Sequence, residues 1–192
     1  ERPIRVPACA RGEVLARLED DVRGEDLLPS GARLDELRAR ISSLAGQVLS
    51  GRVPDFAERA RARCGGFLVA GGGFGRGDGL VPAALCLNEL GVHAVLAESY
   101  APCAARTLVH AGVVPLLLAS VGPSAVLACG DELELPGLLD RLRPDAPLEA
   151  RNMTRGTRIP LRHELAVREI AILRSGGLVA FALRARSDRG EA

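Results

Sequence analysis

A dense cluster of glycines between an apolar run and a helix start is the feature that most constrains this chain. Residues 67–70 are all apolar and have the length of a buried strand. Six glycines follow within nine positions: Gly71, Gly72, Gly73, Gly75, Gly77 and Gly79. Pro82 then suits the first turn of a helix, which Gly91 ends. This order predicts a loop whose backbone N–H groups can face an anion, because the start of a helix favours negative charge.

The residues of this loop allow two interpretations. Glycines have no side chains that would keep a ligand away from the backbone, which favours a small-anion site. They also adopt positive φ, which favours a tight structural turn without a ligand. A dinucleotide-binding fold is excluded, because no register of residues 71–79 reads G-x-G-x-x-G and the preceding strand is not in the first βα unit.

Apolar runs and helix signals alternate after the loop and predict an α/β fold. Val92–Ala97 and residues 113–119 are strand candidates, and Pro102 opens a helix between them that Gly112 ends. With residues 67–70 they make a strand–helix–strand–helix–strand run. Such a run predicts a parallel sheet with right-handed crossovers.

The first third of the chain carries weaker patterns. Residues 13–18 alternate in hydrophobicity and predict a strand. The side chains expected on one face of it are Val14, Ala16 and Leu18. Apolar residues at spacings of three and four predict a helix over 34–49, and Pro54 starts a short helix that turns Phe56 inward.

The last third changes to short strands divided by turns. The strand candidates are residues 126–128, 132–135, 148–151 and 158–161. Residues 136–142 and 164–173 predict helices. We therefore expect one α/β domain over residues 13–183, with a parallel βαβ core and a C-terminal antiparallel β appendage. An N-terminal arm over 1–12 and a polar tail over 184–192 complete the expected organisation.

Composition excludes several classes of partner. Lys and Arg number 25 against 24 Asp and Glu, a formal net charge of +1, and only 3% of residues are aromatic, so nothing favours a nucleic-acid partner. No apolar run approaches the ~20 residues of a membrane span, and the N-terminus lacks the apolar core of a signal peptide. We expect no membrane partner and a cytoplasmic location.

The five cysteines and three histidines form no recognisable metal motif. No C-x-x-C pair is present, so the sequence predicts no zinc or iron–sulfur site in this chain. We expect reduced thiols that mostly fill small apolar spaces.

Several ordered blocks resemble the C-terminal swivel domain of aconitase, which is also the small subunit of isopropylmalate isomerase. Residues 53–60 resemble D-P-D-F-A-x-R-A, residues 66–77 resemble G-G-x-I-V-G-G-E-N-Y-G-Q-G, residues 91–101 resemble G-V-R-A-V-I-A-K-S-F-A, and residues 112–116 resemble G-I-L-P-L. Residues 130–133 and 168–177 resemble the family's tail in its short bacterial form. The resemblance covers about residues 13–183 and implies a swivel domain with β/β/α layers.

The resemblance also implies a chemistry. In this family a [4Fe–4S] cluster held by three other domains binds the substrate, and the enzyme moves water across a carbon–carbon double bond of a carboxylic acid. The swivel domain closes over the cluster with a serine base and arginines that clamp carboxylates. The implied partner is a cluster-bearing large subunit or a set of upstream domains. No cofactor would be bound by this chain itself, and a small carboxylate is the implied substrate.

This sequence departs from the family where the chemistry should lie. The family motif is G-S-S-R-E-H, whereas residues 77–82 of this chain are G-D-G-L-V-P. Gly79 stands at the serine position and Leu80 at the arginine position. In the earlier motif D-x-x-T-T-D-H-I-x-P, the functional aspartate position is Glu25. Arg38 keeps its type at the position of a substrate-clamping arginine.

The residues leave three functional hypotheses open. We prefer a diverged swivel domain that has lost ordinary dehydratase chemistry and serves a cluster-bearing partner. The second hypothesis is an active hydro-lyase on an altered substrate, in which Arg76 takes the carboxylate and Asp78 the proton, with Glu25 and Arg38. The third is a free-standing module whose loop holds a small anion. For any ligand in the loop we expect contacts with Arg38, Gly77, Asp78 and Gly79.

Overall fold

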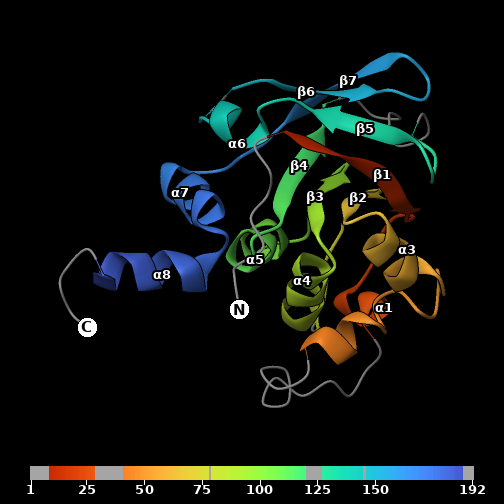
Figure 1. Ribbon diagram of the computed structural model, residues 1–192, viewed down its shortest axis with the longest axis horizontal. Helices are drawn as coiled ribbons and strands as arrows, with labels where there is room; N and C mark the ends of the chain where they lie inside the picture. The colour runs from red at the N-terminus through yellow and green to blue at the C-terminus, as the bar shows by residue number, and fades with distance from the viewer. Residues whose placement is uncertain (1–8, 29–40, 78, 120–126, 145, 188–192) are drawn as a thin grey trace.

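Parallel strands form one half of the sheet in the computed structural model, which describes residues 9–28, 41–77, 79–119, 127–144 and 146–187 (Figure 1). These strands are β1 (Ala10–Arg17), β2 (Gly66–Ala70), β3 (Val92–Ala97) and β4 (Val114–Leu118). Each pairs in parallel with the next one along the chain. The helical crossovers between them confirm the predicted parallel βαβ core.

Antiparallel strands complete the sheet and close it. They are β5 (Glu132–Leu135), β6 (Leu148–Asn152) and β7 (Thr157–Arg162). β7 pairs with β4, β6 with β7, and β5 with both β6 and β1, so the described strands make a closed barrel in the order β1-β2-β3-β4-β7-β6-β5. The antiparallel strands expected as an appendage therefore belong to the main sheet. Closure leaves neither half with an unpaired edge.

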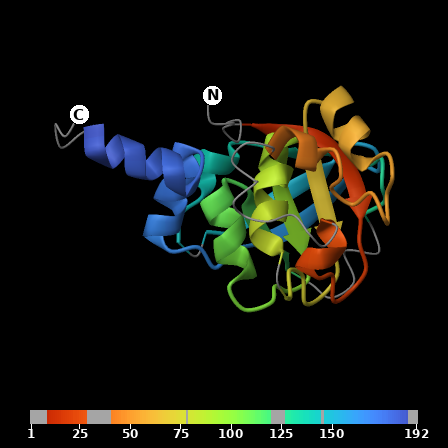
Figure 2. The ribbon, with the colours of Figure 1, turned by 90° about the horizontal axis from the view of Figure 1, so that it is seen from below.

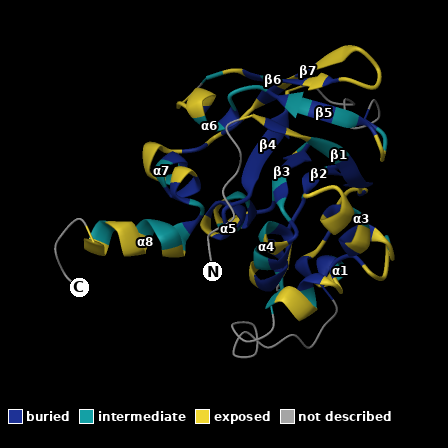
Figure 3. Cartoon of the chain, in the orientation of Figure 1, coloured by how far each residue is buried: buried dark blue, intermediate teal, exposed yellow. Residues whose placement is uncertain are grey.

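Helices cover the outside of the parallel half, as Figures 1 and 2 show from two directions. They are α1 (Gly24–Leu27), α3 (Phe56–Ala62), α4 (Leu80–Glu89) and α5 (Ala104–Ala111). One apolar core lies between these helices and the sheet, and a second fills the barrel (Figure 3). Alternate residues of β2 serve the two cores: Leu68 packs toward the helices, while Phe67 and Val69 point into the barrel.

The C-terminal helices sit at one end of the barrel. They are α6 (Leu138–Arg141), α7 (Val167–Ser175) and α8 (Leu178–Ser187). α7 packs on α5, whereas α8 extends away from the barrel in both ribbon views (Figures 1 and 2). Within the described ranges no helix combines the length and apolar character needed to cross a membrane.

Several predicted boundaries differ from the structure. The first strand begins at Ala10, inside the expected arm, and α8 continues to Ser187, inside the expected polar tail. Of the helix expected over 34–49, residues 34–40 lie outside the described residues and residues 41–45 are helical. Residue 126 also lies outside them, and residues 127–128 are not in a strand.

A bulge in β1 makes the predicted facing of this strand wrong. Its pairing with β2 shifts register between Val14 and Ala16. Val14 therefore packs inside the barrel, while Ala16 and Leu18 pack toward the helices. A β-bulge inserts one extra residue and breaks the two-residue alternation on which the prediction rested.

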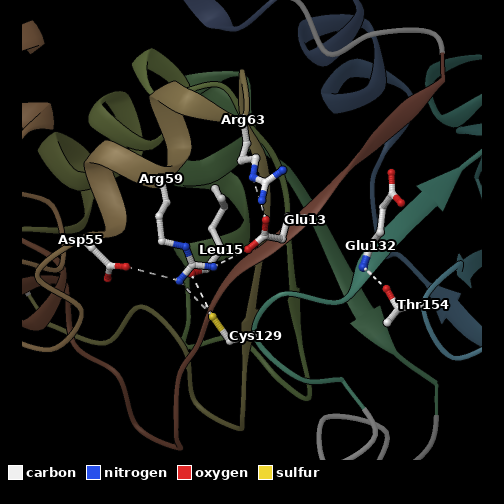
Figure 4. Close-up of polar contacts among 8 residues, drawn as sticks. All are labelled: Glu13, Leu15, Asp55, Arg59, Arg63, Cys129, Glu132 and Thr154. Carbon is white, nitrogen blue, oxygen red and sulfur yellow. Dashed lines mark hydrogen bonds and ion pairs between the residues drawn. The ribbon is translucent and has the colours of Figure 1, made fainter.

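A polar cluster joins α3 to β1 (Figure 4). Arg59 donates to Glu13 Oε1 at 2.5 Å and to Cys129 Sγ at 3.2 Å, and Arg63 pairs with the second oxygen of Glu13 at 3.0 Å. Cys129 Sγ in turn donates to the carbonyl of Leu15 at 3.4 Å. The cysteine serves here as a polar partner for the helix.

The expectation that the cysteines fill apolar spaces is wrong for most of them. The exposed cysteines are Cys9, Cys64, Cys103 and Cys129. Cys86 alone among the five is buried, and burial raises the pKa of its thiol to about 11.

Candidate functional site

The glycine loop lies between the end of β2 and the start of α4, against the acidic turn that follows β1. Gly72 N–H donates to the Asp20 carboxylate at 2.6 Å, and Gly75 N–H donates to the carbonyl of Val22 at 2.8 Å. Gly73 N–H donates to the hydroxyl of Ser99, after β3, at 2.9 Å. These three donors therefore hold acceptors of the chain itself, which corrects the expectation that they converge on an outside anion. The carboxylate of Asp20 supplies the negative charge that such donors favour.

Backbone conformation supports the second interpretation of the loop, a turn that requires glycine. Gly73, Gly75, Gly77 and Gly79 all have positive φ, between 69° and 88°. Only glycine adopts this region at no steric cost. The loop also pairs with its surroundings, through isolated bridges from Arg76 to Arg23 and from Phe74 to Tyr100.

The two positions that the family resemblance assigns to chemistry face the protein. Gly79 precedes α4 with φ 88°, and a Cβ there would lie 3.3 Å from the backbone carbonyl carbon of Gly24. Leu80 is only 5% exposed and belongs to the core under the helices. Its Cδ2 atom would lie 2.9 Å from a Cβ placed on Gly75, so the side chain packs beneath the loop.

The remaining candidate residues are only partly brought together. Glu25, in α1, has Oε1 3.4 Å from the point where a Cβ on Gly77 would stand, so these two positions are neighbours. Arg76 pairs with Asp21 at 3.4 Å, and Glu25 lies 3.9 Å from Arg23.

Two predicted site residues, Asp78 and Arg38, lie outside the described residues.

A cavity of about 390 Å³ lies beside the loop, at the carboxyl ends of β3 and β4. Its walls come from the segment after β3, the first turn of α5, β4, and the chain from the end of β7 into α7. Ser99 lines this cavity and also accepts the Gly73 N–H, so it joins the cavity to the loop. Sequence reasoning missed Ser99 as a site residue. Its position directly after a parallel strand is the signal that could have found it, since ligands of α/β sheets bind there.

Tyr100 holds this segment in place. Its hydroxyl lies 2.8 Å from the carbonyl oxygen of Val95 and 3.1 Å from that of Leu116, on two neighbouring strands. Its ring meets Phe74 of the glycine loop edge to face, with centroids 6.0 Å apart. Burial raises the pKa of the Tyr100 hydroxyl well above its ordinary value, so the group acts as a neutral anchor.

The arrangement of potential metal ligands does not favour a metal site in the described part of the chain. Across the described ranges, no group of three or more His, Cys, Asp or Glu side chains is arranged to hold a metal ion. The donor set of this part of the chain therefore does not fit an iron–sulfur cluster, which requires several thiolates at one place.

Comparison with known proteins gives consistent matches along most of the chain. No protein-family model matches it. The chain is 33% identical over 165 residues to 3-isopropylmalate dehydratase small subunit 2 of Archaeoglobus fulgidus, covering 84% of this chain and 88% of the relative. It is 32% identical over 139 residues to the methanogen homoaconitase small subunit of Methanothermobacter thermautotrophicus, covering 72% of each.

A solved structure has the same fold. The crystal structure of 3-isopropylmalate dehydratase from Methanocaldococcus jannaschii superposes with a TM-score of 0.76 at 22% identity. The match covers 95% of this chain and 98% of the other.

Proposed function

This chain belongs to the family of 3-isopropylmalate dehydratase and homoaconitase small subunits, and from this membership we propose that it is the swivel subunit of an aconitase-type assembly. We further propose that its glycine loop no longer supplies the acid–base groups of an ordinary dehydratase. Its role is then to close over a partner and shape the substrate site without transferring the proton.

The observation that carries this proposal is the packing at Gly79 and Leu80. A hydroxyl and a guanidinium are missing at these positions, and the leucine side chain fills the core beneath the loop. An arginine at residue 80 would have to place its charge in that core, which is costly without a buried partner. The leucine at residue 80 therefore contributes to the packing of α4 against the core.

The charged groups nearby are weak replacements. Arg76 and Glu25 each have an ionic neighbour on the turn after β1, Asp21 and Arg23 respectively. Loss of a proton-transfer group typically costs 10²- to 10⁴-fold in rate, roughly the scale of general acid–base catalysis. A replacement acid–base pair would have to recover this rate enhancement with exposed side chains, whose electrostatic interactions are screened by solvent.

The partner in this proposal is a large subunit, or a set of upstream domains, that carries a [4Fe–4S] cluster. Such a cluster would supply Lewis-acid activation of a carboxylate substrate when bound to that partner. The residues described in this chain do not fit the cluster, so no step of the proposal passes through a metal held here.

Size-exclusion chromatography of this chain mixed with an aconitase-type large subunit encoded in the same genome tests the assembly. We expect the two to elute together as one larger species, with the cluster absorbance on the large subunit. Separate elution at micromolar concentrations of both proteins would contradict the proposed role as a subunit.

The active-enzyme alternative has its own test. The mixture is assayed for hydration or isomerisation of a carboxylic acid. If Asp78→Ala, Arg76→Gln or Glu25→Gln abolishes that turnover, the hypothesis of an active hydro-lyase on an altered substrate replaces the proposal that the loop transfers no proton. Arg186→Gln, on the exposed end of α8, is the matched surface control.

A further inference from the structure

The cavity beside the glycine loop has the position and size of a ligand site that the proposed function does not use. It opens at the carboxyl ends of the parallel strands β3 and β4, where α/β proteins bind small molecules. Its volume of about 390 Å³ lies within the range of small-molecule pockets. The lost serine and arginine positions, Gly79 and Leu80, are not among the residues that line it.

Hydrogen-bond donors face this cavity from the segment after β3 and from α5. Ser99 already accepts the Gly73 N–H, so the hydroxyl hydrogen of this exposed serine remains to be donated. Arg106, exposed in the first turn of α5, pairs with no acidic group of the residues that the structure describes. The start of α5 has no side-chain cap, so its helix dipole adds to the positive potential.

Acidic side chains among the lining residues limit the charge that the cavity can accept. Glu164 is 3.2 Å from Arg162, and Glu169 accepts the Ala166 N–H at 2.8 Å, so both carboxylates have partners. Glu98 also borders the cavity. A ligand with several negative charges would be repelled by these carboxylates, whereas one carboxylate can be matched by Arg106.

Apolar residues also line the cavity. They are Ala101, Ala105, Pro115, Leu117 and Leu165. A short hydrocarbon chain placed against them would be removed from water, which stabilises the bound state.

We propose that this cavity binds a short-chain monocarboxylate, with its carboxylate held by Arg106 and Ser99 and its hydrocarbon tail against Leu117 and Leu165. Because Ser99 also holds Gly73, occupancy of the cavity acts on the glycine loop. The site belongs to this chain alone and goes beyond the proposed partner function.

Amide chemical-shift perturbation of this chain with butyrate tests this site, and butyramide is the uncharged control. We expect butyrate to shift the signals of residues 98–106 and 162–169, with butyramide much weaker. Arg106→Gln removes a charge-assisted hydrogen bond, so butyrate affinity should fall about tenfold or more. Ser99→Ala should give a smaller loss, and Arg186→Gln should bind as the unchanged chain does.

Four results of this experiment would contradict the proposal. Absence of shifts, equal shifts with butyramide, or equal affinity in Arg106→Gln would overturn the site, and tighter binding of succinate than butyrate would overturn the monocarboxylate assignment. Unchanged spectra of the variants without ligand establish that they are folded. Because no partner is present, failure here leaves the proposed subunit role untouched, and failure of complex formation leaves this site untouched.

Discussion

Both the identity of Leu80 and its buried environment support the proposed loss of acid–base groups from the glycine loop. The family resemblance places Leu80 at an arginine position, but the sequence does not show where the leucine side chain points. The structure adds that Leu80 is 5% exposed and packs under Gly75. The residue type at a motif position can be read from the sequence. The direction of its side chain depends on the turn that precedes the helix.

Truncation of Leu80 tests its structural role. Leu80→Ala should lower the free energy of unfolding by about 2–4 kcal/mol, because it removes buried methyl groups and leaves a cavity. Val81→Ala, at a position that is 48% exposed in the same helix, should change it by about 0.5 kcal/mol or less. Urea denaturation of both variants measures the difference, and equal small losses would mean that Leu80 does not support the core.

Asp131 gives the fold a specific pH dependence. Burial alone would raise the pKa of this carboxyl, but hydrogen bonds from Ala128 N–H, Arg155 and Asn152 together hold its pKa below the ordinary value. A carboxyl with a lowered folded-state pKa contributes stability that is complete above its unfolded pKa of about 4 and is lost as pH falls through the folded pKa.

Asp131→Asn should therefore cost about 1–3 kcal/mol near neutral pH, the scale of hydrogen bonds to a charged group. The gap between the two proteins should narrow as the pH is lowered below the ordinary carboxyl range. Unfolding curves across pH measure this gap, with Asp140→Asn, at an exposed position of α6, as the control. A gap that stays constant with pH would show that the charge of Asp131 is not involved.

At the scale of elements, local signals predicted the centre of the molecule well. The strand, glycine loop and helix of residues 66–91 appear in order, and β3 has the predicted bounds. The bulge in β1 was not predictable, because it depends on how that strand pairs with β2. The extent of α8 was missed because a polar composition does not distinguish a surface helix from a tail.

The turn between α3 and β2 shows how tightly the elements approach. Gly65 has φ 103°, and a Cβ there would overlap the carbonyl oxygen of Gly91. Gly156 has φ 67° with no other atom within 4 Å, and Gly51 has an ordinary φ with equally open space.

Alanine at these three glycines should give a graded series. Gly51→Ala should leave the free energy of unfolding almost unchanged, Gly156→Ala should cost about 1 kcal/mol for the left-handed conformation, and Gly65→Ala should cost about 4 kcal/mol or prevent folding. Thermal and urea unfolding measure the order. A mild effect at Gly65 would show that the contact with Gly91 can relax.

At the scale of the whole molecule, the family and the α/β class were predictable, but closure of the barrel was not. The closing contacts join β1 to β5 and β4 to β7, which lie far apart in the chain. Such pairings depend on the strand edges that are still unpaired after the parallel half has formed. No local sequence pattern encodes them. The cavity was missed for the same reason, since its walls come from segments that are separate in the sequence.

The contacts that hold the glycine loop do not depend on the group at residue 79. The loop is held by the turn after β1 and by Ser99 and Tyr100 after β3, and each of these contacts is independent of a hydroxyl at residue 79. The packing of the barrel and its helices is therefore independent of whether the loop transfers protons.

Turnover by the reconstituted assembly tests the central claim most directly. With the cluster-bearing large subunit and this chain mixed in equal amounts, we predict formation of a stable complex that converts neither 3-isopropylmalate nor citrate faster than the large subunit alone. Rapid turnover of either acid that requires this chain would contradict the account, because it would show that the glycine loop still supplies the proton-transfer chemistry we consider lost.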